Sequence, residues 1–287
     1  MRQLSAVFIM GALSLLACVP ARAIDAAELW RPCAQSELIV EGTVSVPLNK
    51  DGRIEAGSDG YTAVFVRVDR TIKGPKQGSV VVRQYVNDRR YDAIKRQLTG
   101  FDGQRAVLFL VSASDDGVNR NWYFAGLRTG LALFAPDAAP GVAAEVERQR
   151  VVLLNWKPHS RDGDRKAVKV FIDRMVDAKA EEPAFKTLES LGAPYVPAII
   201  DLMDDRRELA TKALSLRNYA PDRFEEFRLY GPKLIVDAVA AILNQITHED
   251  FGFIYNGATD AERNRTVAGW RIYQDVLLNH QGWLKAG

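Results

Sequence analysis

The sequence predicts an α+β protein with two domains, an antiparallel β-barrel or sandwich followed by an α-helical domain. Between residues 37 and 134, short β-branched runs alternate with turn residues, which is typical of a small barrel or sandwich. From residue 165 onward, apolar residues recur at helical spacing. Between the two stretches lies KPHSRDGD, a polar break with proline and glycine. We therefore expect a β-rich domain at 24–160 that ends in a helix, and a helical domain at 161–287.

The spacing of apolar residues identifies the individual strands. In 61–73, YTAVFVRVDRTIK, a spacing of two places Val64, Val66, Val68 and Ile72 on one face, as in a half-buried strand. The turn residues GPKQG follow, so this strand and the next predict a hairpin. By the same criteria we expect strands at 37–46, 61–73, 79–86, 104–112, 121–126 and 131–134, and helices at 88–98 and 141–156.

Residues 1–23 have the three parts of a secretory signal peptide. A short basic start, MRQ, precedes an apolar run from Leu4 to Val19, and Ala21-Arg22-Ala23 supplies the small residues of a cleavage site. A membrane-spanning helix needs about 20 apolar residues, and this run is shorter. We therefore predict a periplasmic or secreted bacterial protein that is cleaved after Ala23.

A second processing scheme involves the first of the two cysteines. The sequence LLAC ending at Cys18 resembles a bacterial lipobox, which would make Cys18 the lipidated first residue of an outer-membrane lipoprotein. We favour cleavage after Ala23 because the apolar run and the small residues both fit that scheme. Under either scheme Cys33 has no second cysteine with which to form an intramolecular disulfide. We expect Cys33 to be buried, as free cysteines usually are.

Charge gives no indication of a nucleic-acid partner. The chain has 38 Lys and Arg against 36 Asp and Glu, a formal net charge of +2. Removal of Arg2 and Arg22 with the signal peptide leaves 36 basic residues against 36 acidic ones. Binding to nucleic acid usually depends on a basic surface, which a formally neutral protein does not predict.

The β-rich domain resembles a known class of barrel. The succession VEGTV, VFVRVDRTIKGP, GSVVVRQY and RAVLFLV, within residues 37–136, resembles a β-domain at the front of exported bacterial proteins. Such domains are similar to small OB-like or netrin-type barrels, a family that includes metalloproteinase inhibitors. Those inhibitors present a cysteine at the mature N-terminus to the target metal. Cys33 lies inside the mature chain, so no inhibitory residue is transferred to this sequence.

The helical domain contains one unit that resembles a HEAT repeat, a packing module. The unit, 188–218, has the pattern LG-x-P-x-x-P-A-I-I-x-L-M-D-D-x-R-x-x-A-x-x-A-L. It predicts one helix that ends near Gly192, a second with Val196 to Met203 on one face, and a third through 209–216. Only this unit matches well, and a capping box at Thr259 begins the last helix. We expect a compact HEAT-like bundle or short solenoid.

Residues with catalytic potential are few. The chain has three histidines, and it contains no helical His pair, Cys–His cluster, Gly-x-Ser-x-Gly elbow, P-loop or dinucleotide motif. His159, Asp162 and Asp164 form the only place where a base and carboxylates gather, so they are the candidate catalytic residues. A solvated polar linker is the commoner interpretation of such a segment. We expect neither a cofactor nor a bound metal.

These observations favour a non-enzymatic exported binding or scaffold protein whose partner is another periplasmic or envelope protein. One alternative is a periplasmic hydrolase with its site between the two domains, which a concave pocket with displaced pKa values would indicate. The other alternative is a lipoprotein anchored in the outer membrane through Cys18, the one case in which we expect membrane contact. The sequence predicts no particular substrate, partner or oligomeric state.

Overall fold

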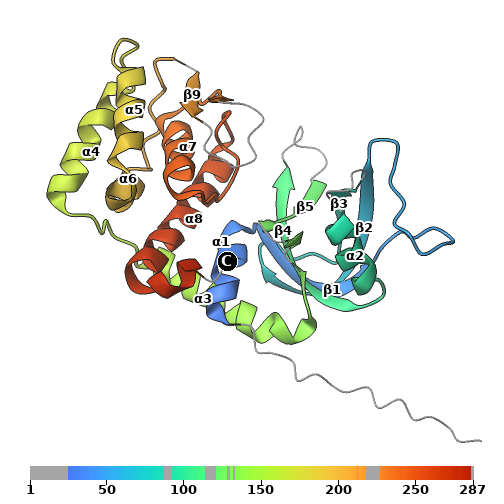
Figure 1. Cartoon of the computed structure of the whole chain (residues 1–287). Helices are drawn as coiled ribbons and strands as arrows, with labels where there is room; N and C mark the ends of the chain where they lie inside the picture. Colours follow the sequence, from blue (N-terminus) through green and yellow to red (C-terminus); the bar gives the residue numbers. More distant parts are fainter. Residues whose placement is uncertain are drawn as a thin grey trace, which may run out of the picture.

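The computed structural model confirms the α+β fold class. A β-barrel and a group of helices lie side by side (Figure 1). The predicted signal peptide at 1–23, with Cys18, lies outside the described residues. Every helix within them is too short or too polar to cross a bilayer. The structure describes residues 25–86, 92–113, 121–127, 130–131, 133–211, 213–217 and 227–285.

Five strands form the closed barrel, in the order β1-β2-β3-β5-β4 with β4 also paired to β1. All neighbouring strands are antiparallel except β3 and β5, which are parallel. The helix α2 connects β3 to β4, and its Leu98 is buried in the barrel core. The strands and this helix are β1 (Leu38–Ser45), β2 (Tyr61–Lys73), β3 (Ser79–Tyr85), α2 (Asp92–Phe101), β4 (Arg105–Ala113) and β5 (Asn121–Phe124).

The barrel core confirms the two-residue spacing of the strands. Val64 and Val66 of β2 and Leu108 of β4 are fully or almost fully buried inside the barrel. On β5, Trp122 and Phe124 are also buried there. Three two-residue strands follow β5, so the strand expected at 131–134 is divided between the last two of them: β6 (Gly126–Leu127), β7 (Gly130–Leu131) and β8 (Leu133–Phe134).

The pairing of β1 with β2 contains two register shifts, each with an extra residue on β2. A Cβ atom at Gly42 would lie 2.3 Å from the carbonyl oxygen of Arg67, so glycine permits this close approach of the two strands. The shifts change which face of β2 is buried toward its end. Ile72 therefore packs outside the barrel, against the cluster that contains Leu29 and Cys33. The prediction that Ile72 shares a face with Val64 is wrong.

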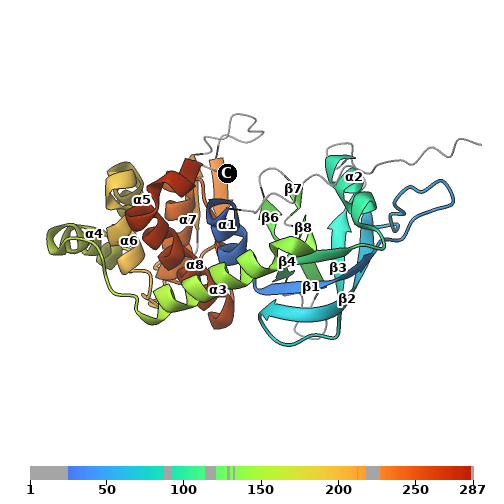
Figure 2. The ribbon, with the colours of Figure 1, turned by 90° about the horizontal axis from the view of Figure 1, so that it is seen from below.

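The remaining helices form a second body beside the barrel (Figure 2). They bury a continuous apolar core that includes most of α7 and one side of α8. They are α1 (Ala26–Gln35), α3 (Ala139–Leu154), α4 (Asp162–Arg174), α5 (Glu181–Leu191), α6 (Val196–Asp201), α7 (Ile235–Thr247) and α8 (Asp260–Asn279), with short 3₁₀ turns at Pro136–Ala138, Ala193–Tyr195 and Gln281–Lys285.

The HEAT-like unit is only partly helical. The first expected helix ends as predicted at Leu191, followed by Gly192 with a φ of 68°. The third expected helix, through 209–216, is wrong. The backbone N–H of Leu209 donates to the carbonyl of Lys233, so this segment is bonded to a neighbouring segment and not to its own preceding turn. The chain continues as β9 (Leu214–Arg217), which pairs with β10 (Phe227–Tyr230).

Helix α1 joins the barrel to the helices, although it comes first in the described sequence. Its Trp30 is fully buried in the helical core, whereas Leu29 and Cys33 lie in a cluster with β4 and α3. Figures 1 and 2 show α1 between the two bodies. The side-chain amide of Gln149 on α3 donates to the carbonyl of Trp30 at 2.8 Å. The burial of Cys33 confirms that expectation, and the boundaries at 24–160 and 161–287 stay predictions.

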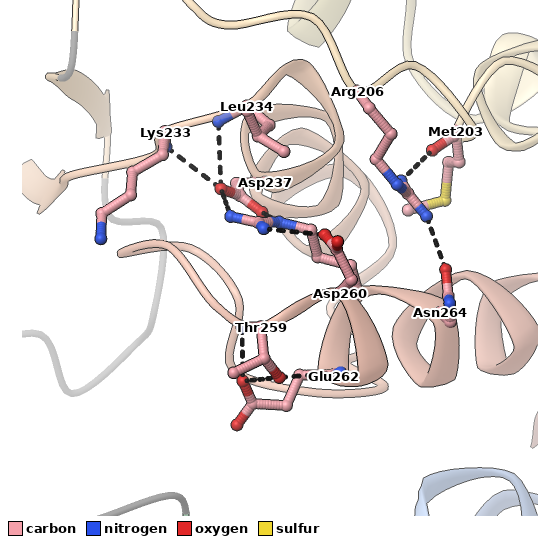
Figure 3. A network of polar contacts seen from close by, with 10 residues as sticks. Met203, Arg206, Lys233, Leu234, Asp237, Thr259, Asp260, Glu262 and Asn264 are labelled. Atoms are coloured by element: carbon pink, nitrogen blue, oxygen red, sulfur yellow. Dashed lines mark hydrogen bonds and ion pairs between the residues drawn. The ribbon is translucent and has the colours of Figure 1, made fainter. Parts of the chain in front are cut away.

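A buried ion pair fixes α8 against α7. The guanidinium of Arg263 donates to both carboxylate oxygens of Asp237, at 2.8 and 2.9 Å. Asp237 is fully buried and also accepts from the N–H groups of Lys233 and Leu234, each at 3.1 Å (Figure 3). Because every oxygen of the carboxylate has a donor, the desolvation cost of the charge is largely offset.

The start of α8 has the predicted capping box. The hydroxyl of Thr259 accepts from the N–H of Glu262 at 3.3 Å, and the carboxylate of Glu262 accepts from the N–H of Thr259 at 2.7 Å (Figure 3). One turn further along, Asn264 accepts from the guanidinium of Arg206 at 2.9 Å. The Arg206 bond and the Asp237 pair join the first turns of α8 to the rest of the helical body.

We expect replacement of Arg263 by alanine to lower the free energy of unfolding by about 3–5 kcal/mol, because buried Asp237 would lose its charged partner. Urea denaturation followed by circular dichroism measures this change. The matched control is Arg150→Ala, which removes the exposed partner of Glu147 and should leave the denaturation midpoint unchanged. Equal midpoints for the two variants would contradict the stabilising role of the buried pair.

Candidate binding pocket

A pocket of about 670 Å³ lies where the barrel meets the helices. Ligand pockets typically enclose roughly 300–1,000 Å³. The barrel contributes the residues just before β1 and the ends of β2 and β4, which lie at one edge because both strands are antiparallel to β1. Tyr123 and Phe124 of β5 complete this side of the pocket. The helical body contributes the end of α1, one side of α3 and α8, and the segment 250–254 before α8.

Apolar side chains from both bodies form much of the pocket wall. The ring of Phe251 lies 5.0 Å from that of Trp270 and 6.2 Å from that of Trp30, centroid to centroid, so it connects α8 with α1. A Cβ atom at Gly269 would lie 2.4 Å from the Cβ of Phe251, so glycine is required for this approach. Ile272 continues the same side of α8 along the pocket.

Charged side chains gather at the edge where the barrel meets α8. The guanidinium of Arg265 lies 3.2 Å from the carboxylate of Glu37, and the hydroxyl of Ser112 donates to the same carboxylate oxygen. The ammonium of Lys73, the last residue of β2, donates to the carbonyl of Cys33 at 2.7 Å. Glu37, just before β1, therefore forms one polar cluster with residues from β2, β4 and α8, which we call the Lys73–Glu37–Arg265 cluster.

Burial changes the protonation of this cluster. Burial is the main reason that the pKa of Lys73 falls to about 8; Cys33 and Glu37 oppose the change, and the positive charge of Arg265 contributes to it. Burial also raises the pKa of the Cys33 thiol, so that the thiol stays neutral near pH 7 and adds no negative charge beside Lys73. The Lys73 ammonium is therefore mostly protonated at neutral pH but close to its titration range.

Two buried polar atoms of the pocket have no hydrogen-bond partner among the described residues: the side-chain oxygen of Gln35 and the hydroxyl of Thr266. The amide nitrogen of Gln35 donates to the carbonyl of Asp250 at 3.0 Å, which identifies the other atom as the oxygen acceptor. An unpaired buried polar atom costs roughly 1–3 kcal/mol. Both atoms lie in the wall of the pocket with almost no exposed surface, so a bound molecule would complete their hydrogen bonding only after a small shift of that wall.

The candidate catalytic residues from the sequence lie away from this pocket. His159 is exposed, and its backbone N–H donates to the carboxylate of Asp201 at 3.2 Å. The side chain of Asp162 is 80% exposed and pairs with Arg165 at the start of α4. Asp164 lies in the same first turn and is partly exposed. The structure thus places these three residues near one another on the surface, and none of them lines the pocket.

No group of three or more His, Cys, Asp or Glu residues within the described ranges could hold a metal ion. Comparisons with protein-family models, with curated proteins and with solved structures found no match to this chain.

The pocket residues have little signature in the sequence. Lys73 ends a strand just before a Gly-Pro turn, and Glu37 begins another, so both resemble ordinary polar residues at strand ends. Arg265 and Thr266 fall within a helix whose neighbouring residues include several charges. In the structure, Lys73 pairs with Ile39 across β1 and β2, which brings Lys73 close to Glu37. A prediction of this strand register would have been needed to place the two side chains together.

We expect the Lys73 amine to titrate near pH 8, well below the ordinary lysine value of 10.5. After reductive ¹³C-methylation, NMR titration of the signal absent from Lys73→Met measures this value directly. The folded state loses this proton before the unfolded state does, so the lysine contributes a rise in the free energy of unfolding between pH 8 and 10.5.

Lys73→Met should lack that rise, whereas the exposed control Lys166→Met should retain it. The unfolding free energy of the wild type minus that of Lys73→Met should therefore be larger at pH 10 than at pH 7. If this difference is the same at both pH values, the lowered pKa is contradicted.

Proposed function

We propose that this protein is a non-enzymatic exported binding protein that holds a segment of a partner protein in the pocket between barrel and helices. The observation that carries the proposal is a pocket of ligand size with two buried, unpartnered polar atoms, on Gln35 and Thr266, among the described residues. A ligand that donates hydrogen bonds would remove the cost of leaving them unpaired once the wall shifts to expose them. A polypeptide backbone has one N–H donor on every residue except proline.

An exposed aromatic side chain that lines the pocket, with an exposed leucine on the nearby strand β10, supports a protein partner. Phe253 lines the pocket and is 81% exposed, and its ring lies 6.3 Å from that of Tyr255. Tyr255 in turn contacts Tyr230 at the end of β10, on which Leu229 is 80% exposed. Aromatic residues are enriched at protein interfaces relative to the rest of the surface. A partner that covers this surface would bury Phe253.

The fold supports the two resemblances found in the sequence. A five-stranded barrel with a helix between β3 and β4 is consistent with an OB-like domain, a class of barrel that binds extended ligands. The HEAT-like resemblance is supported by α5 and α6 alone. Both resemblances concern packing, so the proposed function rests on the pocket and not on them.

A hydrolase with its site in the same pocket is the second candidate. One observation favours it: Lys73, whose pKa is lowered, lines the same pocket as Ser112, which has a hydroxyl group. Perturbed pKa values cluster at catalytic sites, although structural charge clusters produce them too. Ser112 donates its hydrogen bond to Glu37, so the observed bond does not pair it with the amine.

Export to the periplasm is part of the proposal and leads to a definite mature N-terminus. Mass spectrometry of protein recovered from the cell envelope should find a chain that begins at Ile24, because the small residues before it fit the signal-peptidase site. A diacylated Cys18 as first residue would instead favour the lipoprotein alternative. A full-length chain that retains Met1 would count against export by cleavage.

Cross-linking of the mature protein in a periplasmic extract should capture a specific envelope protein. Ala268→Trp, which fills the pocket from α8, should reduce the captured amount at least about tenfold, since a loss of 1.4 kcal/mol has that effect. The matched control is Ala261→Trp, on an exposed position of the same helix. Equal capture by both variants would overturn the pocket as the binding site. Cleavage of the captured partner, lost in Lys73→Met, would favour the hydrolase.

A further inference from the structure

The geometry points to the C-terminus of the partner chain as the segment that enters the pocket. In this arrangement its terminal carboxylate lies at the Lys73–Glu37–Arg265 cluster, and its last side chain packs against the apolar wall. This inference rests on the proposed function, because it specifies the chemistry of a ligand for the same pocket.

The charge of the cluster supports an anionic group. Two cations, Lys73 and Arg265, face one carboxylate, Glu37, and Lys73 makes no ion pair within the described part of the chain. The side chain of Arg265 is 39% exposed and that of Glu37 only 12%, so the cation is the more accessible member of their pair. One added carboxylate would balance the local charge. Charge-assisted hydrogen bonds to a carboxylate are roughly twice as strong as neutral ones.

The other carboxylates of the pocket limit where an anion can bind. Asp250 and Glu262 also line it, so the lining as a whole has three carboxylates against two cations. The carboxylate of Glu262 accepts from the N–H and the hydroxyl of Thr259, both at 2.7 Å, and so points back to the start of α8. A ligand with a single negative charge fits this distribution better than a polyanion, whose further charges would approach these carboxylates.

The apolar wall supports a side chain next to that carboxylate. Phe251, Ile254 and Ile272 come from the helical body, and Val111 and Phe124 come from the barrel. Gly269 allows Phe251 to lie directly on α8, which leaves its ring as a wall between the two bodies. Transfer of an apolar side chain from water to an apolar surface is favourable, so this wall would favour a large apolar last residue.

The unpartnered atoms support a backbone beside the carboxylate. The amide oxygen of Gln35 can only accept, and the hydroxyl of Thr266 can accept or donate. After a small shift of the pocket wall that exposes these atoms, successive N–H groups of a peptide would supply the donors that both lack. Recognition of a C-terminal carboxylate together with adjacent backbone groups is a recurring mode of peptide binding.

Paired peptide arrays test this inference on the intact mature protein. One array displays random hexapeptides with free C-terminal carboxylates, and its twin displays the same peptides with amidated C-termini. We expect the best binders to carry an apolar last residue and to lose at least about tenfold in affinity on amidation, as loss of a charge-assisted hydrogen bond implies. For Lys73→Met and Arg265→Ala, the difference between acid and amide should shrink, while exposed Arg150→Ala should behave as the wild type.

The outcomes separate this inference from the proposed function. Equal binding of acid and amide peptides, with both reduced by Ala268→Trp, would keep the pocket as a peptide site and overturn the role of the C-terminus. Binding of amidated peptides that depends on an internal Asp or Glu would overturn it as well. Absence of binding in both arrays would overturn the proposed function together with this inference. Circular dichroism of each variant checks that it is folded.

Discussion

Helix α1 takes Trp30 into the helical core while Leu29 and Cys33 pack beside the barrel, and the pocket depends on both contacts. The two anchors are separated by less than one helical turn, so any movement of one body is transmitted to the other. Gln149 of α3 holds the carbonyl of Trp30 at 2.8 Å, and Lys73 of β2 holds that of Cys33 at 2.7 Å. The end of α1 is thus bonded to elements on both sides of the pocket.

The local structure of the barrel could be predicted from the sequence because strand spacing is a local property. The bounds of β2 agree with the expected 61–73, and those of β1 and β3 differ from expectation by one residue at most. The closure of β4 onto β1 and the parallel pairing of β3 with β5 depend on contacts between remote segments. Ile72 shows the same limit, because the register shifts that redirect it arise from pairing and not from its own neighbours.

The helical body was predicted less well for a related reason. The first helix of the HEAT-like unit ends at Leu191 as expected, because glycine at a helix end is a local signal. The run from Leu209 has helical spacing, yet it pairs with the segment around Lys233. The candidate site could not be predicted, since Gln35, Lys73 and Arg265 lie far apart in sequence and meet only through the fold. The hydrolase alternative did predict a pocket between the two bodies, but it placed that pocket around His159, which does not line the observed one.

The burial of Cys33 has a practical consequence for study of the junction. It is the one cysteine within the described residues, and it lies on the side of α1 that packs against β4 and α3, with no exposed surface. A thiol reagent can reach it only when α1 separates from its neighbours. When reclosing is fast, the modification rate reports the free energy of that opening, and when reclosing is slow it reports the opening rate itself. The natural sequence therefore already contains a probe for separation of barrel and helices, without an introduced label.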